Sequence, residues 1–377
     1  MIFKRRHKRS ESSAPPELCV RWSSEHARHT DRLRLAGTGS RRGRGKDLTS
    51  MAASVVPAWD ETRVTVLEPN RLDRRVPAEG LRAGRFYPAA LVDGDAPQAS
   101  GGVFYVIDAD PSGIRADFNH PLSPYALELF VTNGARPSRE TLTEALGAGP
   151  GMQGPIAARG PGPDETGAYA REDECSDTLF YERPRLVAHL DATALAHVRA
   201  LYSRFIGSGM AVLDLMASWD SHLPAQSDLE VTGLGMNRQE LEHNAALTER
   251  VVHDLNADPR LPFPAARFDA AVCTVSLEYL IDPVPVLREV GRVLVPGAPA
   301  VIVCSDRWFP PKVTRLWTEL HPFERVGLVA YWMRESGWFT DIATESIRGD
   351  SRPADDPHWG QRSEADPVFA VWGRVEP

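Results

Sequence analysis

Apolar runs that end in small or polar residues organise the second half of the chain. Met210–Leu213 is such a run; it ends at Asp214, and small and polar residues follow. This pattern indicates a buried parallel strand that delivers an acid to the carboxyl edge of a sheet. Further apolar runs alternate with helical patterns, which predicts a doubly wound α/β sheet. These further predicted strands are Leu229–Leu234, Phe268–Val275, Ala298–Cys304, Phe339–Ser346 and Val368–Arg374.

Segments with apolar residues at helical spacing precede and separate these strands. Leu195, Val198 and Leu201 recur at three-residue steps within Ala192–Ile206, which predicts an amphipathic helix ahead of the sheet. A second helix is predicted over Pro285–Leu294, with proline at its start and Pro296-Gly297 after its end. Residues 323–337 form a third. Ligands of such sheets bind outside the carboxyl ends of the strands.

The first half of the chain has a different pattern. Residues 60–134 hold short strand candidates separated by Gly, Asp and Pro, which predicts a small β-rich module. Residues 135–177 are rich in Gly and Pro and read as a linker, with a short helix over Ser138–Leu146. The strand candidates of the module are Val64–Leu67, Phe86–Val92, Val103–Ala109, Gly113–Asp117 and Ala126–Thr132.

Charge is unevenly distributed along the 377 residues. Residues 1–50 carry 13 Lys and Arg and 5 Asp and Glu, a net charge of +8, and lack an apolar period. We therefore expect a disordered basic tail there, with Lys4–Arg9 as its most basic part. The remaining residues carry 30 basic and 46 acidic side chains, a net charge of −16. This balance argues against a nucleic-acid partner for the folded part.

Other classes are excluded by composition. No run of 18 apolar residues exists, so we expect no membrane span and a cytoplasmic protein. The four cysteines are scattered without a Cys-x-x-Cys pair, which argues against a zinc site and a disulfide framework. We expect no metal. The sequence predicts no oligomeric state.

Five motifs follow one another in the second half of the chain: Val212–Trp219, Gly233–Asn237, Val252–Asn256, Leu261–Phe263 before Phe268-Asp269, and Glu289–Gly297. With these motifs, residues 178–375 resemble class I S-adenosylmethionine-dependent methyltransferases of the methyltransferase type 11 kind. The resemblance implies a Rossmann-like sheet of seven strands over residues 178–377, and S-adenosylmethionine as the cofactor. A nicotinamide oxidoreductase is less consistent with the chain, which lacks the Gly-x-Gly-x-x-Gly loop.

The resemblance also implies the cofactor site. Asp214 would accept a hydrogen bond from the ammonium group of the donor. The first loop, which supplies Met216, Ser218 and Trp219, contains no glycine, although this loop is usually glycine-rich. Gly235 occupies the usual place of the acid that binds the ribose, so Asn237 or Glu240 would substitute for it.

The adenine and methyl-transfer contacts follow from the next motifs. Asp254 and Leu255 would meet the adenine, or Asp254 caps a turn. Met236 either lies against the adenine or fills the core. Thr274 faces the expected methyl-transfer space.

Four residues are substrate candidates: Tyr279, Asp306, Arg307 and Trp308. Each follows a predicted strand at the edge where a substrate would bind, although packing or surface roles are equally ordinary for such residues. We assign His222 to packing or to the surface, and no pairing of a histidine with an acid is evident. The acceptor is unspecified, with a small molecule as the default.

The β-rich module resembles part of the SlyD-like FKBP-type prolyl isomerases through Arg75–Pro77, Leu81–Phe86 and Asp117–Leu122. In that family the corresponding insert holds unfolded chains. The resemblance implies contact with an unfolded chain or another protein, or else a module that only packs. The competing function for the whole chain is a non-catalytic, chaperone-like binding protein with a degenerate cofactor pocket.

Overall fold

The computed structural model describes most of the chain. The basic cluster Lys4–Arg9, the segment Arg75–Pro77 and most of the Gly/Pro-rich linker lie outside the described residues. The described ranges are 16–35, 48–73, 81–93, 102–110, 113–132, 137–147, 167–225 and 228–376.

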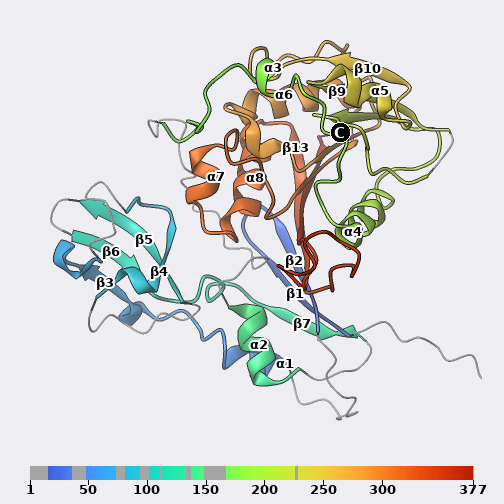
Figure 1. Ribbon diagram of the computed structural model, residues 1–377. Helices are drawn as coiled ribbons and strands as arrows, with labels where there is room; N and C mark the ends of the chain where they lie inside the picture. The colour runs from blue at the N-terminus through green and yellow to red at the C-terminus, as the bar shows by residue number, and fades with distance from the viewer. Residues whose placement is uncertain are drawn as a thin grey trace, which may run out of the picture.

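A ten-stranded mixed sheet forms the body of the molecule (Figure 1). Its order is β10-β9-β8-β11-β12-β14-β13-β2-β1-β7. The first seven of these strands confirm the predicted α/β fold, with β14 antiparallel to both of its neighbours. Their bounds are β8 Ala211–Leu215, β9 Glu230–Gly235, β10 Glu249–Val252, β11 Ala270–Thr274, β12 Pro299–Cys304, β13 Phe339–Arg348 and β14 Val368–Val375.

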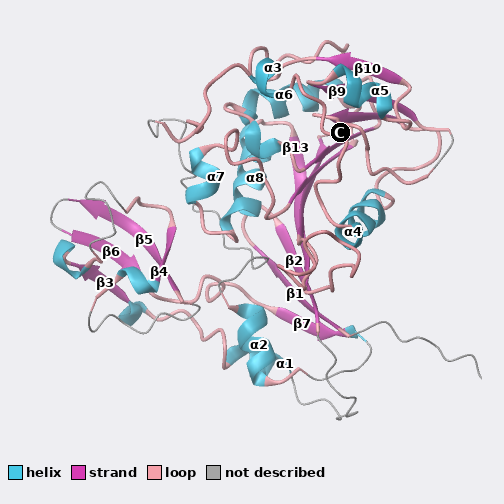
Figure 2. Cartoon of the chain, in the orientation of Figure 1, coloured by secondary structure: helices cyan, strands magenta, loops and turns pink. Residues whose placement is uncertain are grey.

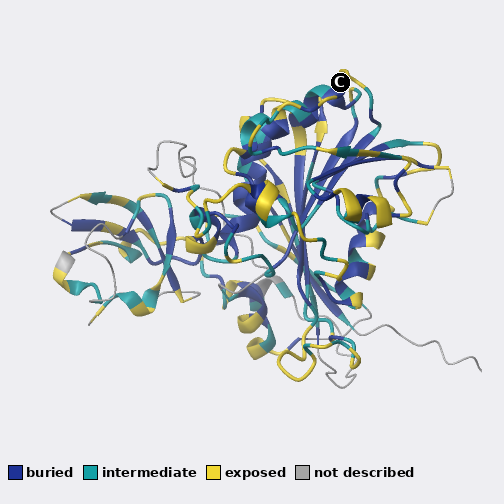
Figure 3. Cartoon of the chain, turned by 45° about the horizontal axis from the view of Figure 1, so that its top comes forward, coloured by how far each residue is buried: buried dark blue, intermediate teal, exposed yellow. Residues whose placement is uncertain are grey.

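Helices cover both faces of this sheet (Figure 2). One face packs apolar residues of α6 and α8 against the strands, and the other packs α4 and Leu241 of α5. The central strands are almost entirely buried, as the hydrophobic runs predicted (Figure 3). The helices are α3 Asp177–Phe180, α4 Ala192–Tyr202, α5 Arg238–His243, α6 Pro283–Val293, α7 Arg315–Glu319 and α8 Glu324–Glu335. Of the described helices, none has the length and hydrophobicity needed to cross a membrane.

Two strands arise from the segment that the sequence predicts to be disordered. β1 (Glu17–Ser23) and β2 (Arg28–Arg34) form an antiparallel pair, and β2 lies parallel to β13. The prediction of a disordered tail is therefore wrong for these residues. It failed because β2 is rich in charge, and those charges are paired within the sheet: Arg32 with Glu17 and Glu345, and Asp31 with Arg348.

The small module is a separate four-stranded antiparallel sheet of order β3-β6-β5-β4. The fifth strand predicted for it, β7 (Glu128–Val131), instead pairs with β1 at the edge of the large sheet. Two helices, α1 (Leu48–Ala53) and α2 (Arg139–Leu146), pack near β7, and α2 confirms the predicted helix and its Ser138 cap. The other bounds are β3 Val64–Leu67, β4 Phe86–Pro88, β5 Val103–Asp110 and β6 Gly113–Asp117.

The Asn119-His120 pair of the module builds its own loop. The Asn119 amide donates to the Asp60 carbonyl and to Asp117, and its carbonyl oxygen accepts from the Asp60 amide. Both ring nitrogens of His120 are also engaged, with the Leu146 carbonyl and the Leu122 amide. These contacts explain the motif as loop construction, and the resemblance to the prolyl isomerases is not confirmed.

A chain that begins at Met51 tests the importance of β1 and β2. The loss of both strands exposes the edge of β13, removes Asp31 from Arg348, and leaves Glu345 with Arg204 as its remaining partner. Breaking a buried pair costs about 3–5 kcal/mol, so we expect a Tm at least ~10 °C lower in a thermal melt, or aggregation. A chain that begins at Pro16 keeps both strands and is the control. Equal melting of the two truncated chains would contradict the prediction.

Candidate functional site

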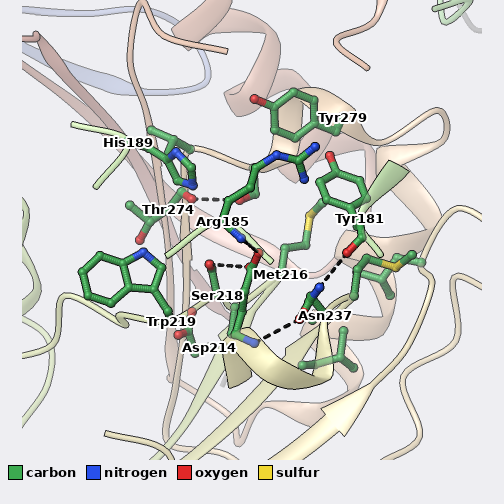
Figure 4. A pocket seen from close by; sticks show the side chains of 18 of the residues that line it. Tyr181, Arg185, His189, Asp214, Met216, Ser218, Trp219, Asn237, Thr274 and Tyr279 are labelled. Atoms are coloured by element: carbon green, nitrogen blue, oxygen red, sulfur yellow. Dashed lines mark hydrogen bonds between the residues drawn. The ribbon is translucent and has the colours of Figure 1, made fainter. Parts of the chain in front are cut away.

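A cavity opens at the carboxyl ends of the parallel strands (Figure 4). The loops after β8, β9, β10 and β11 form its floor and sides. A segment that precedes the sheet, residues 177–189, supplies the remaining wall, and we call it the strap. The structure brings every residue that was predicted to contact the cofactor to this cavity: Asp214, Met216, Ser218, Trp219, Gly235, Met236, Asn237, Asp254, Leu255 and Thr274.

Asp214 is the unusual group of the cavity. It lies at the end of β8 with 4% of its surface exposed, and its Oδ2 has no hydrogen-bond partner among the described residues. Burial raises the pKa of this carboxyl to about 7, although a hydrogen bond from Ser221 opposes the rise. An acid held without a counter-charge in a cavity is a site for a cation.

The first loop turns without glycine. Met216 adopts a φ of 57°, a left-handed conformation that costs a residue with a side chain about 1–2 kcal/mol. The next amide, of Ala217, donates to the Leu234 carbonyl, so the loop is drawn tightly onto β9. A Cβ atom at Gly235 would lie 2.1 Å from the Ala217 carbonyl oxygen. Gly235 therefore lacks a side chain because the first loop passes directly over it.

The edge after β9 holds Asn237 and Glu240. The Asn237 side chain is fully engaged: its oxygen caps α5 at the Glu240 amide, and its nitrogen donates to the carbonyls of Tyr181 and Glu182 in the strap. The Glu240 carboxylate accepts from the Ser218 hydroxyl and from the Arg185 amide. Of the two predicted substitutes for the ribose-binding acid, Glu240 is thus the one with a charge and lone pairs to spare.

The turn after β10 supplies Asp254 and Leu255. One oxygen of Asp254 accepts from the amides of Asn256 and Ala257, which is the capping role expected as the alternative. Its other oxygen has no partner in the described part of the chain. Asp254 thus builds the turn and still presents one acceptor to the cavity.

The end of β11 forms the opposite side. The Thr274 hydroxyl lies 2.6 Å from the Tyr202 hydroxyl, and the next residue, Val275, has a φ of 43°. Positive φ is rare for a β-branched residue and marks local strain. Tyr279, a predicted substrate contact, lines the cavity, and its hydroxyl accepts from the Phe309 amide.

The structure does not bring the other three substrate candidates to the cavity. Asp306 pairs with Arg362, and Arg307 lies 3.6 Å from Asp366. Trp308 packs under the Arg325 guanidinium instead. The loop after β12 directs these side chains into ion pairs and packing, and Phe309 lines the cavity in their place.

Ion pairs anchor the start of the strap. Asp177 accepts from Arg171, from the fully buried Lys312 at 3.1 Å, and from Asn256 beside the cavity. These contacts hold the pKa of Asp177 below its ordinary value, although burial opposes them. The sequence reads this segment as a lead-in and gives no periodic signal for such long-range pairs.

A histidine–acid pair at the rim was missed by the sequence reading, which assigned His222 to packing or to the surface. Nδ1 of His222 lies 3.0 Å from Oδ2 of Asp220, and both residues line the cavity. The hydrogen bond from His222 holds the pKa of Asp220 far below its ordinary range. Nε2 of His222 has no partner among the described residues, so it can accept a proton.

Among the described residues, no group of three or more His, Cys, Asp and Glu side chains could hold a metal ion. The four cysteines are free thiols.

Replacement of Gly235 by alanine should disrupt the site. The added Cβ overlaps the Ala217 carbonyl, and neither backbone can yield without loss of the strand or of the loop. We expect a loss of unfolding free energy of at least about 1–3 kcal/mol, measured by denaturant titration. Gly207→Ala is the control, because its Cβ would meet nothing within 4 Å. Equal stability of the two variants would show that the loop can move.

Replacement of Asp214 by asparagine should stabilise the ligand-free protein. The raised pKa means that the folded state pays for ionisation of Asp214 as pH rises from about 4 to about 7. The asparagine avoids this cost, which is on the order of 1.4 kcal/mol per pKa unit. The gain in Tm should grow from pH 4 to pH 7 and remain constant above it.

Asp220→Asn is the control for this measurement. Its pKa is lowered by His222, so its ionised form stabilises the folded state and the substitution should reduce the Tm at pH 8. A fall in Tm for Asp214→Asn at pH 8 would contradict the assignment of an unpaired buried charge.

Comparison with known proteins agrees with this geometry. Residues 207–302 match the family model described as a methyltransferase domain. Curated proteins give no match.

Solved structures resemble about half of the chain. A SAM-dependent methyltransferase of Aquifex aeolicus is 16% identical, with 50% of this chain and 91% of that chain covered and a TM-score of 0.32. An arsenic(III) S-adenosylmethionine methyltransferase of Chlamydomonas reinhardtii is 19% identical, with 49% and 72% covered and a TM-score of 0.32. The phosphoethanolamine N-methyltransferase 2 of Haemonchus contortus, solved with S-adenosylhomocysteine, is 12% identical, with 48% and 53% covered and a TM-score of 0.34.

Because these TM-scores lie below 0.5, the strand order and the family match carry the assignment. The seven strands from β10 to β13 form the α/β sheet expected of the fold, and the matched residues run from just before β8 into β12. The chain therefore contains a doubly wound α/β sheet, and residues 207–302 of it match a methyltransferase domain.

Proposed function

We propose that this protein transfers a methyl group from S-adenosylmethionine to a small-molecule acceptor. The observation that carries the proposal is the Asp214 carboxyl, buried at the end of β8 with Oδ2 unpartnered. A buried acid of this kind fits the ammonium group of the donor, and such a pair removes the cost of an isolated charge.

Other residues of the cavity match the remaining parts of the donor. We propose that Glu240 binds the ribose hydroxyls and that Asp254 and Leu255 contact the adenine, since all three residues line the cavity. When bound, S-adenosylmethionine supplies a methyl group on a sulfonium, which is already a good leaving group. The protein can therefore contribute much of the rate by orientation alone, through the strap and the rigid strand ends.

Proton removal is the second task of the site. An acceptor hydroxyl, thiol or ammonium must lose a proton as it is methylated, and Nε2 of His222 is available for it. Asp220 then stabilises the charged imidazole at Nδ1. The pair thus gives the cavity a general base without a metal.

Calorimetric titration with S-adenosylmethionine tests the proposal. We expect binding with a Kd below about 1 mM, and at least about tenfold weaker binding for Asp214→Asn because the ion pair is lost. Only the ionised carboxylate can pair with the ammonium, so affinity should fall as pH drops below about 7. It should fall by about tenfold per pH unit, since one proton must leave. In Asp214→Asn this dependence should be absent.

The same titration distinguishes methyl transfer from the competing function, a non-catalytic binding protein. The first loop lacks glycine, which favours a binding protein with a degenerate cofactor pocket. No heat of binding at millimolar S-adenosylmethionine, with a normally folded protein, would favour that function over methyl transfer. Weak binding of S-adenosylmethionine whose affinity is the same at every pH and in Asp214→Asn would contradict the role given to this acid.

A further inference from the structure

Arg185 occupies an aromatic corner of the cavity. Its guanidinium carbon lies 4.5 Å from the centre of the Phe180 ring, 5.2 Å from that of Phe309 and 5.7 Å from that of Tyr181. In Figure 4 the guanidinium is turned toward Tyr181 and Tyr279 and away from Asp214. Stacking on aromatic faces leaves the edge of a guanidinium free to donate hydrogen bonds in its own plane.

The guanidinium lacks a counter-charge. Nη2 donates to the Phe180 carbonyl, but Nη1 is buried without a hydrogen-bond partner, and no carboxylate in the described part of the chain forms an ion pair with Arg185. Among the residues that line the cavity, Arg185 is the sole arginine or lysine. A buried donor of this kind destabilises the ligand-free protein while it is unsatisfied.

The acids nearby already have partners. Asp177 is held by Arg171 and Lys312, and Asp220 is held by His222 and Arg199. Glu240 accepts from Ser218 and from the backbone of Arg185. Of the carboxyl groups that line the cavity, Asp214, Glu240 and Asp254 thus have no cation as a partner among the described residues, and the Arg185 guanidinium has no carboxylate as a partner.

We infer that Arg185 binds an anionic group of the methyl acceptor, so that the acceptor is a small carboxylic acid or a similar planar anion with an apolar or aromatic body. The inference rests on the proposed function. The guanidinium fork matches a carboxylate with two hydrogen bonds, and the rings of Phe309, Tyr181 and Tyr279 match an apolar body.

The only carboxylate of S-adenosylmethionine is an alternative occupant of Arg185. That carboxylate is attached to the same carbon as the ammonium, which we assign to Asp214. Arg185 reaches instead toward Tyr279 and Phe309, the residues that follow β11 and β12. This separation favours the acceptor over the donor.

The test measures anion binding to the protein saturated with S-adenosylhomocysteine. The probes are benzoate and indole-3-acetate, with benzamide and indole-3-acetamide as neutral counterparts, followed by calorimetry and saturation-transfer NMR. We expect the acids to bind and the amides to bind at least about tenfold more weakly, as the loss of a charge-assisted hydrogen bond requires. Arg185→Met should weaken the acids at least tenfold, and Arg185→Lys should weaken them less.

Arg183→Met is the matched control, because Arg183 is exposed on the same strap. It should leave acid binding unchanged, and Tm values of all variants should remain close to that of the parent protein. Binding of S-adenosylmethionine should change by less than about threefold in Arg185→Met.

Three outcomes would overturn the inference. The first is an absence of acid binding at tens of millimolar although S-adenosylhomocysteine binds. The second is equal acid binding to Arg185→Met and the parent protein. The third is a loss of affinity in Arg185→Met for S-adenosylmethionine but not for its decarboxylated form, which would assign Arg185 to the donor. An absence of S-adenosylhomocysteine binding to the parent protein would instead refute the proposed function itself.

Discussion

The burial of one carboxyl at the end of β8 is the constraint on which the site depends. β8 lies between β9 and β11, so Asp214 is enclosed by neighbouring strands and has little access to water. A parallel sheet produces this situation wherever a central strand ends in an acid, because the edge is covered by loops from both sides. The fold thus holds a charge that it cannot satisfy alone, and the ligand-free protein is less stable for it.

The strap limits access to that charge. It is fastened at its start by Asp177, which joins Arg171, Lys312 and Asn256, and along its length by Asn237 and Glu240. These contacts connect the strap to the loops after β9 and β10, which form part of the cavity. A change in the position of the strap would therefore alter both of these sides of the cavity together.

Sequence patterns were sufficient for the central strands of the large sheet because the signal of these strands is local. Each of β8, β11 and β12 is a largely apolar run, and Asp214 and Thr274 lie at the ends of such runs. β10 contains no such run, and Asp254 and Leu255, which follow it, were predicted from the resemblance of their motif. Contacts between distant segments carry no such signal. β2 was missed because Arg28–Arg34 reads as a charged stretch until Glu17, Glu345 and Arg348 are placed beside it.

The same limit applies to the substrate corner. Asp306, Arg307 and Trp308 have suitable chemistry and a suitable place in the chain, but their partners come from residues about 20 to 60 positions away. The prediction for His222 failed for a local reason. His222 and Asp220 are separated by a single residue, and the backbone at His222 is left-handed, with a φ of 54°, where the two side chains meet. Neither outcome is contained in residue type or spacing.

The first loop, which has no glycine, makes a close backbone contact with β9. Close passage of the loop over β9 requires that one of the two backbones carry no side chain at the crossing. In this chain the strand provides that residue, since Gly235 lies under the Ala217 carbonyl. The loop then keeps side chains at Met216 and Ala217 and accepts the strain of a left-handed methionine. A side chain at this position of the second strand is thereby excluded on steric grounds. The nearby carboxylate of Glu240 lies in the first turn of α5, where the hydrogen bond from Ser218 holds it against the same loop.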